Sequence, residues 1–360
     1  MKNNRIVVTG ACGTIGAELI SQLLADPVHT PEEVIGLDNN ESQLFFMEQR
    51  YLDDPRVRFY VADIRDRDEL LRKMKGVDIV FHTAALKHVI LSERSPEQVV
   101  QTNIQGVQNV IAASTERGVK RVVFTSSDKA VNPTNVMGTS KLMGERLITA
   151  ANSHKRGNGP IFTSTRFGNV LGSNGSVVPV FRDQIAKGGP VTVTDPEMTR
   201  FVMSVSQAVR LVIDSVALAY GGEVFITKMP VVRIVDLAKA MIEDLAPQYG
   251  FDPEQVEIRF IGAKAGEKLY EELMSQEEIR RAIELKDYFA VLPAFRGVYH
   301  DIAYDYSDIL NGVVSKPYVS AEESFMSIPD IKVFLRENHL LDAPVLPDVI
   351  HSSTKKEFRQ

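Results

Sequence analysis

The sequence predicts an α/β fold, in which a Rossmann-type, doubly wound parallel sheet is joined to a smaller α/β substrate-binding lobe. Short apolar segments alternate with helical segments over about the first 168 residues, an order typical of βαβ units and a parallel sheet. The apolar segments are continuous, as expected for strands covered on both faces. A glycine-rich loop lies between the first strand and the first helix, where this fold binds nucleotides.

The expected strands follow one another along the first half of the chain. They are Arg5–Thr9, Val34–Asp38, Val57–Ala62, Asp78–His82, Val119–Ser126 and Ile161–Phe167. Helices are expected where apolar residues recur at helical spacing. They include Gly16–Ala25, Leu70–Lys75, Glu97–Arg117, Val136–Ala151, Ser206–Ala219 and Val232–Leu245. We assign residues 1–168 to the nucleotide-binding domain, with part of 202–225 returning to it, 169–335 mainly to the lobe, and 336–360 to a polar tail.

Length, charge and cysteine content limit the classes of protein to which the chain can belong. The 360 residues suffice for one or two domains, and the formal net charge of −6 gives no support for a nucleic-acid or membrane partner. The single cysteine, Cys12, excludes an intrachain disulfide and fits a reducing compartment. Neither a signal-peptide segment nor a bilayer-spanning apolar run is present. We expect a soluble cytoplasmic protein that binds no metal.

The stretch VTGACGTIG places Gly10, Gly13 and Gly16 directly between the first strand and the first helix. Glycines permit a tight turn and a close approach of the backbone to phosphate, and the helix N-terminus presents free N–H groups to a pyrophosphate. The motif has the strand and the helix that it requires on either side, so we prefer dinucleotide binding to a simple strand–helix turn. Cys12 is better explained as a small filler than as a reactive thiol.

The ends of the next strands carry further candidate cofactor contacts. Asp38 ends the second strand, where it can bind a ribose 2′-hydroxyl, which favours NAD over NADP. Asp63 follows the third strand and could reach the adenine. After the fourth strand, Ala84 and Ala85 would let the dinucleotide pass close to the backbone. Lys87 is a candidate for a cofactor or substrate contact, whereas the neighbouring His88 is better explained as a loop histidine.

Six segments in order identify a family resemblance: TGACGTIG, HTAALKH, TSSDKAVNPTNVMGTSK, RFGNVLGSNGSVVPVF, TDPEMTRFVMS and GAKAGEKLYEEL. Together they resemble the extended short-chain dehydrogenase/reductases that act on nucleotide sugars. More narrowly, the chain is similar to the soluble half of the UDP-N-acetylglucosamine 4,6-dehydratases of the polysaccharide-biosynthesis group, over roughly residues 5–275. The resemblance implies NAD as cofactor and a UDP-sugar as substrate. The full set of implied cofactor-binding positions is Gly10, Gly13, Thr14, Ile15, Gly16, Asp38, Asn39, Asp63, Ile64, Ala84, Ala85, Lys87, Asn103 and Lys141.

A 4,6-dehydratase needs an acid and a base beside C5 and C6 of the sugar, because it removes the C5 proton and protonates the departing 6-hydroxyl. Asp128 and Lys129 lie just past a central strand, where open α/β sheets place their ligands. The resemblance implies that Asp128 is the acid and Lys129 the base. Lys129 would need a lowered pKa to work near neutral pH. Without the surrounding motif, the pair would be interpreted as an ordinary surface pair.

Met137 stands where simple dehydrogenases of this fold usually hold a tyrosine base, and Lys141 follows it by four residues on the same helical face. Lys141 is expected to hold the nicotinamide ribose. Because methionine has no proton to exchange, the C4 hydroxyl must give its proton to Asp128, Ser127 or a water held by them. We favour Asp128, which could then deliver that proton to the 6-hydroxyl. The VMG motif resembles the dehydratases that retain configuration at C5.

The implied sugar-nucleotide contacts lie after the sixth expected strand. They are Asn169, Ser176, Val177, Arg200 and Glu267. Lys87, after the fourth strand, is a further candidate. Arg200 is a natural diphosphate ligand, because guanidinium binds phosphate oxygens with two parallel donors. Relatives usually have arginine where this chain has Lys264, and lysine keeps the charge but loses the fork. This departure bears on the assignment of the substrate more than on the type of reaction.

Two alternatives remain open at this point. A UDP-sugar 4-epimerase on the same fold needs only oxidation, rotation and reduction, and it normally relies on the missing tyrosine. A non-catalytic NAD-binding regulator would explain that loss, but not the intact Asp128, Lys129, Lys141 and Arg200. We therefore prefer the dehydratase. The resemblance alone also implies a homo-oligomer.

Overall fold

A computed structural model describes residues 1–28, 30–154, 159–173, 175–262, 266–295 and 302–342. Within these residues ten strands form one sheet. In spatial order they are β16 (Ile309–Asn311), β14 (Ala282–Leu285), β15 (Tyr288–Val291), β10 (Val224–Thr227), β6 (Ile161–Arg166), β5 (Arg121–Thr125), β4 (Ile79–His82), β1 (Arg5–Thr9), β2 (Glu33–Asp38) and β3 (Val57–Val61).

The strands from β3 across to β10 run parallel. The chain begins at β1, moves outward to β2 and β3, and then crosses to β4 on the other side of β1. The strand order therefore reverses between β1 and β4, and the loops that follow these strands open a crevice there. β15, β14 and β16 continue the sheet antiparallel, although they fall within the range 169–335 that was expected mainly in the lobe.

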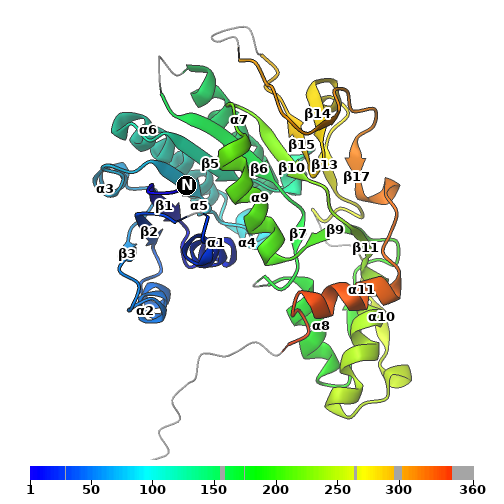
Figure 1. Ribbon diagram of the computed structural model, residues 1–360. Helices are drawn as coiled ribbons and strands as arrows, with labels where there is room; N and C mark the ends of the chain where they lie inside the picture. The colour runs from blue at the N-terminus through cyan, green and yellow to red at the C-terminus, as the bar shows by residue number, and fades with distance from the viewer. Residues whose placement is uncertain (29, 155–158, 174, 263–265, 296–301, 343–360) are drawn as a thin grey trace, which may run out of the picture.

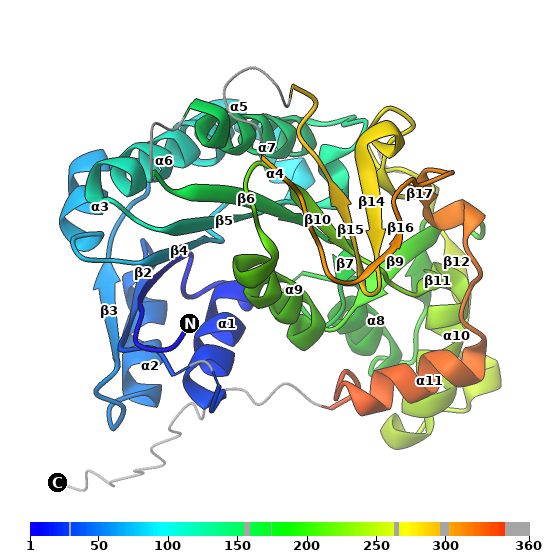
Figure 2. The same ribbon diagram turned by 45° about the horizontal axis from the view of Figure 1, so that its top comes forward.

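Helices cover both faces of this sheet (Figures 1 and 2). On one face α1 (Thr14–Ala25) packs against α9 (Val205–Leu218), and on the other α6 (Gly106–Arg117) packs against α3 (Arg67–Lys73) and α7 (Val136–His154). Apolar side chains of the sheet fill the core on each side. The remaining helices of this half are α2 (Glu41–Arg50), α4 (Val89–Arg94) and α5 (Pro96–Val99). The result is a three-layer arrangement of helices, sheet and helices.

The expected elements agree closely with these bounds. β1 matches its expected range residue for residue, and β2, β3, β4 and β6 each differ by one residue at one end. β5 begins two residues later and ends one residue earlier than expected. The helix expected at Leu70–Lys75 begins earlier, because the Asp66 side chain accepts the Glu69 N–H and caps α3. The single helix expected over Glu97–Arg117 contains a wide π-helical turn at Val100–Gln105.

The lobe has its own core and lies beside the carboxyl ends of the parallel strands (Figure 1). Its helices are α8 (Val177–Ile185), α10 (Ile234–Leu245) and α11 (Ile328–Glu337). Its strands are β7 (Asn169–Val170), β8 (Val191–Val193), β9 (Thr199–Met203), β11 (Val231–Arg233), β12 (Ile258–Phe260), β13 (Glu272–Met274) and β17 (Tyr318–Val319). Phe181, Leu237 and Leu335 join the three helices in one apolar cluster. α11 extends into the range expected as a tail, and residues 343–360 lie outside the described residues.

The described part of the chain contains no helix that is both long enough and apolar enough to cross a membrane. The same residues contain no group of three or more metal-ligating side chains in reach of one another.

Candidate active site

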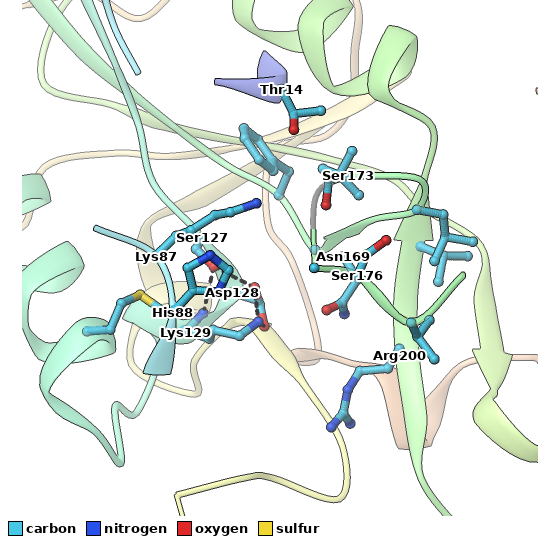
Figure 3. Close-up of a pocket in the computed structure, with 18 of the residues that line it drawn as sticks. Thr14, Lys87, His88, Ser127, Asp128, Lys129, Asn169, Ser173, Ser176 and Arg200 are labelled. Atoms are coloured by element: carbon cyan, nitrogen blue, oxygen red, sulfur yellow. Dashed lines mark hydrogen bonds and ion pairs between the residues drawn. The ribbon is translucent and has the colours of Figure 1, made fainter. Parts of the chain in front are cut away.

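A cavity of about 640 Å³ opens between the sheet and the lobe (Figure 3). The loops after β1, β4, β5 and β6 form one side, and residues of α8, β8 and β9 form the other. The predicted site residues that line it are Gly13, Thr14, Ile15, Gly16, Ala85, Lys87, Ser127, Asp128, Lys129, Lys141, Asn169, Ser176, Val177, Arg200 and Glu267. The predicted positions outside its lining are Gly10, Asp38, Asn39, Asp63, Ile64, Ala84 and Asn103.

The glycine loop leaves no space for side chains at two positions. Gly10 has a φ of +72°, and a Cβ there would lie 2.7 Å from the backbone of Ala84. A Cβ on Gly16 would lie 2.1 Å from the carbonyl oxygen of Gly10. Gly13 precedes α1, so the first N–H groups of that helix face the crevice without a side-chain cap. This cradle fits the diphosphate of a dinucleotide.

Asp38 is fixed at the end of β2 by backbone donors. Its two carboxylate oxygens accept the N–H groups of Cys12 and Asn40, each at 3.0 Å. Burial and the Asp38 charge raise the pKa of the Cys12 thiol to about 12. A thiol that stays protonated is a poor nucleophile, which agrees with Cys12 as a filler of the loop.

Asp63 lies after β3, and its carboxylate forms an ion pair with a neighbouring arginine. Arg65 pairs with it at 2.6 Å, and hydrogen bonds from Arg65 and Asn39 hold the pKa of Asp63 below its ordinary value. Ile64 packs directly against Gly106 of α6, where a Cβ would lie 2.6 Å from its side chain. The adenine contact predicted for Asp63 stays a prediction.

Asn103 does not line the cavity but holds the backbone of Leu86, which does. Its Nδ2 donates to the carbonyl oxygen of Leu86 and to Ser140 Oγ, both at 2.9 Å, and its Oδ1 accepts the Leu86 N–H at 2.8 Å. It lies in the wide turn of the helix, a feature that is frequent at functional sites. The Asn103 amide therefore positions the loop that carries Lys87, and its predicted contact with the cofactor stays a prediction.

Ser127, Asp128 and Lys129 form a hydrogen-bonded group at the end of β5 (Figure 3). Ser127 Oγ donates to Asp128 Oδ1 at 2.6 Å. Lys129 Nζ donates to the two oxygens of Asp128 at 3.1 and 2.9 Å. The Asp128 N–H donates to the carbonyl oxygen of Phe167, which ties this turn to the end of β6. The pair expected from the motif is thus in direct contact at the cavity.

Glu271 joins this group from the lobe, and the sequence reasoning did not identify it. Its Oε1 lies 3.5 Å from Lys129 Nζ and 3.3 Å from Arg200 Nε. Its Oε2 accepts a hydrogen bond from Asn169 Nδ2 at 2.6 Å. Its carboxyl group also hydrogen-bonds Asp128. The signal was the second half of GEKLYEEL, in which we had assigned a role only to Glu267.

Burial and charge together set the ionisation of this group. Burial raises the pKa of Asp128, but the Lys129 charge and hydrogen bonds from Glu271 and Ser127 outweigh burial and hold that pKa below its ordinary value. Burial lowers the pKa of Lys129, yet the charges of Asp128 and Glu271 leave it above its ordinary value. Burial and the Asp128 charge raise the pKa of Glu271 to about 7, because neighbouring buried carboxyls resist ionising together.

Met137 and Lys141 lie on one face of α7 and both line the cavity. Lys141 Nζ donates to the carbonyl oxygen of Thr125 at 2.9 Å. Burial lowers the pKa of Lys141 to about 8, although the charge of Glu145 opposes this shift. The Met137 thioether offers no exchangeable proton, whereas Ser127, Asp128, Lys129 and Lys141 line the same cavity with groups that can exchange one.

Among the predicted sugar-nucleotide contacts, Asn169, Ser176 and Arg200 lie on the lobe side of the cavity, and Lys87 lies across from them (Figure 3). Asn169 lies in β7, and Ser176 precedes α8, which begins at Val177. Among the described residues, Ser176 Oγ is buried without a hydrogen-bond partner. A free hydroxyl beside the first turn of α8 suits an anionic ligand.

Arg200 is engaged with the loop opposite it. Its Nη1 donates to the carbonyl oxygens of Thr199 and Leu269, at 2.8 and 3.2 Å, and its Nη2 donates to that of Lys268 at 2.8 Å. Glu267 Oε1 lies 3.9 Å from Nη2. Arg200 also lines a neighbouring cavity of about 540 Å³, which Asp128, Lys129 and Glu271 line as well. Lys264 lies outside the described residues.

A buried charge cluster fixes the lobe segment that carries Glu271. Arg166, at the end of β6, makes paired hydrogen bonds to Glu145 of α7 at 3.0 and 2.6 Å. It makes a second pair to Glu278 at 3.1 and 3.0 Å. It also donates to the carbonyl oxygen of Leu273 at 2.8 Å. The strand β13, which directly follows Glu271, is therefore anchored to the main sheet.

The family model described as polysaccharide biosynthesis protein matches residues 6–293. The chain belongs to this family. It is 49% identical over 292 residues to an uncharacterized membrane protein of Methanocaldococcus jannaschii, a match that covers 81% of this chain and 86% of the relative. It is 37% identical over 297 residues to the UDP-N-acetylglucosamine 4,6-dehydratase (inverting) of Campylobacter jejuni, with coverages of 82% and 85%.

Other relatives differ from this chain in length or in name. The chain spans 46% of the length of the probable polysaccharide biosynthesis protein EpsC of Bacillus subtilis, to which it is 43% identical over 78% of its own length. A relative from Rickettsia conorii, 37% identical over 79% of this chain and 82% of the relative, is named UDP-glucose 4-epimerase.

Solved structures agree with the fold. Pen from Bacillus thuringiensis superposes with a TM-score of 0.86 at 38% identity, over 94% of this chain and 98% of Pen. A dTDP-glucose 4,6-dehydratase of Streptomyces venezuelae with NAD bound gives a TM-score of 0.64 at 26% identity, over 74% of this chain and 86% of that structure. The chain is an enzyme of the nucleotide-sugar dehydratase and epimerase group.

Proposed function

We propose that the protein catalyses the NAD-dependent 4,6-dehydration of UDP-N-acetylglucosamine to the 4-keto-6-deoxy sugar, with retention of configuration at C5. The observation that carries this proposal is the contact of Ser127, Asp128 and Lys129 at the cavity, with Met137 in place of a tyrosine. An acid and a base in contact meet the needs of elimination across C5 and C6, which simple oxidation does not have.

The crevice between β1 and β4 fits NAD. Gly10, Gly13 and Gly16 would allow the close backbone approach of the diphosphate, and Asp38, at the end of β2, would bind a ribose hydroxyl. Lys141 would hold the nicotinamide ribose from α7. Bound NAD would supply an acceptor for the C4 hydride and a donor of hydride to C6.

The protein's own side chains supply the proton transfers. Asp128 accepts the proton of the C4 hydroxyl, directly or through Ser127, as the C4–H bond breaks. Lys129 removes the C5 proton once the C4 ketone has made it acidic. Asp128 then gives its proton to the 6-hydroxyl, which leaves as water. Lys129 returns its proton to C5, so both side chains end in the state in which they began.

Retention at C5 follows if one base removes and returns the proton on the same face of the sugar. Lys129 can perform both transfers, and Met137 cannot supply a proton from its own position. The named Campylobacter relative is an inverting enzyme, so C5 configuration is where we expect this protein to differ from it.

The sugar nucleotide is expected along the lobe side of the cavity. Asn169 would contact the sugar, and Ser176 and Val177 would place the start of α8 near the diphosphate. Arg200 would exchange one of its loop contacts for a phosphate oxygen, since its guanidinium lines the cavity. Glu267 would accept a hydrogen bond from the ribose of the uridine. Lys87 faces the same cavity from the opposite wall.

A UDP-sugar 4-epimerase is the second candidate, because relatives of comparable identity carry that name. Mass spectrometry of UDP-N-acetylglucosamine incubated with NAD and the full chain separates the two. Loss of one water from the sugar supports the dehydratase. An unchanged mass with a changed C4 configuration would replace it with the epimerase. Asp128→Asn protein serves as the control for chemical breakdown.

A further inference from the structure

The proposed dehydration leaves one proton without an assigned place. Asp128 must begin as a carboxylate, since it accepts the C4 hydroxyl proton, and Lys129 must be a neutral amine before it can accept the C5 proton. In the structure, however, Lys129 lies between two carboxyl groups that favour its ammonium form. The extra proton on Lys129 therefore needs an acceptor other than Asp128.

The contacts around Lys129 identify that acceptor. Within the described part of the chain, Asp128 and Glu271 are the carboxyl groups paired with its ammonium group. Glu271 is 5% exposed and hydrogen-bonds Asp128, so the two buried carboxyls lie side by side. Such a pair holds one proton more readily than two negative charges.

We propose that Glu271 stores the proton released by Lys129 and so makes Lys129 a base. The proton moves from Lys129 Nζ to Glu271 Oε1; one N–H bond breaks, one O–H bond forms, and no electrons are exchanged. After the C5 proton has been returned to the sugar, the stored proton goes back to Lys129. Glu271 acts through Lys129, so it is a positioning residue. The inference rests on the proposed dehydration.

The other neighbours of Glu271 control when it takes up a proton. Arg200 Nε lies 3.3 Å from the same oxygen that faces Lys129, and its charge favours the carboxylate. Asn169 donates to the second oxygen at 2.6 Å. A diphosphate that draws Arg200 away would raise the proton affinity of Glu271. Binding of the sugar nucleotide would thereby prepare Lys129 to act as a base.

Infrared difference spectroscopy of the full chain without substrate provides the first test. The account predicts a buried carboxyl band that titrates near neutral pH in the wild-type protein and disappears in Glu271→Gln. Burial and the Asp128 charge place the pKa of Glu271 at about 7. A wild-type protein without such a band, or a band that persists in Glu271→Gln, would overturn the proposal.

The second test separates C4 oxidation from C5 proton exchange in D₂O, with UDP-N-acetylglucosamine and NAD. Glu271→Gln should keep the rate of C4 oxidation, whereas the rate of C5 exchange should fall by at least about 100-fold. In the wild type, C5 exchange should rise with pH through about 7, as Glu271 becomes an acceptor, and the variant should lose that rise. Glu271→Asp should recover part of the exchange.

Glu272→Gln is the matched control, because Glu272 pairs with Lys268 at 3.2 Å and Asn132 at 3.0 Å instead. Equal C5 exchange in the two glutamine variants would overturn the role of Glu271. A wild-type protein with the infrared band but with neither C4 oxidation nor C5 exchange would overturn the dehydration itself and, with it, this role.

Discussion

Asp128 is the side chain on which both halves of the proposed reaction depend. It accepts a hydrogen bond from Ser127 and pairs with Lys129, so it can receive a proton through one neighbour and act beside the other. We predict that Asp128→Asn loses C4 oxidation and elimination together, each by at least about 100-fold. Stopped-flow absorbance of the nicotinamide and mass analysis of the sugar measure the two steps. Rapid nicotinamide reduction by this variant would show that another group takes the C4 proton.

For Met137 we predict that a substitution leaves turnover almost unchanged. Its side chain is 3% exposed and lines the cavity, but the account assigns it no proton. Met137→Leu keeps the volume and the apolar character, and such swaps usually cost less than about 1.5 kcal/mol of stability. We therefore expect an unchanged pH profile and a turnover rate close to that of the wild type. A turnover loss comparable to that of Asp128→Asn would contradict this role for Met137.

The residues of the site differ in how readily the sequence reveals them. Asp128, Lys129 and Lys141 occur in one continuous motif, so their proximity follows from the local chain. Glu271 reaches the same group from a distant segment, and only the packing of β13 beside the sheet brings it there. The role of Arg166 could not be predicted either, because its partners are distant in sequence. Glu145 lies in α7, and Glu278 lies between β13 and β14.

Among the structural elements, the junction of β6, α7 and the segment after β13 depends on the Arg166 cluster. Arg166 is 1% exposed, and removing its charge takes away the hydrogen-bonded cation of both Glu145 and Glu278, which leaves Glu278 with Arg281 at 3.9 Å. We predict that Arg166→Met lowers the free energy of unfolding by about 3–5 kcal/mol. Chemical denaturation measures this. The control is Arg5→Met, whose exposed pair with Glu32 should change stability by less than about 1 kcal/mol.

The same cluster predicts how stability falls in acid. Burial raises the pKa of Glu278, but the Arg166 charge outweighs burial and lowers it to about 2. A depressed pKa stabilises the fold at pH values above the ordinary value of 4.5. This contribution is lost as the pH falls from 4.5 toward 2. Glu278→Gln should therefore lose much of the pH dependence of unfolding in that interval, and an unaltered dependence would contradict the assignment.

The sequence predicts where the strands and helices lie along the chain better than it predicts how the strands pair. Apolar runs bounded by turn residues located six strands of the sheet within two residues. The short segments β14, β15 and β16 lack such a signal, and their place beside β10 depends on tertiary pairing. The wide turn at Val100–Gln105 was also not predicted, because helical periodicity hardly changes across one wide turn.

At the scale of the whole molecule, the sheet and the lobe divide the chemistry between them. The loops after β1 and β5 supply the glycine loop, Asp128 and Lys129, α7 supplies Lys141, and the lobe supplies Arg200 and Glu271. The proposed acid/base group is therefore complete only where the two parts meet. This arrangement explains why sequence motifs far apart in the chain belong to one site. The homo-oligomer expected from the family resemblance stays a prediction.

The position and configuration of solvent deuterium in the product test the central claim most directly. The full chain would be incubated in D₂O with NAD and UDP-N-acetylglucosamine, and the sugar analysed by mass spectrometry and NMR. The account predicts loss of one water, one deuterium at C5 and retained C5 configuration, because Lys129 removes the C5 proton and, with N–H groups that exchange with D₂O, delivers a deuteron to the same face. A product of unchanged mass without deuterium at C5 would contradict the assignment of Asp128 and Lys129 as the acid and base of a dehydration.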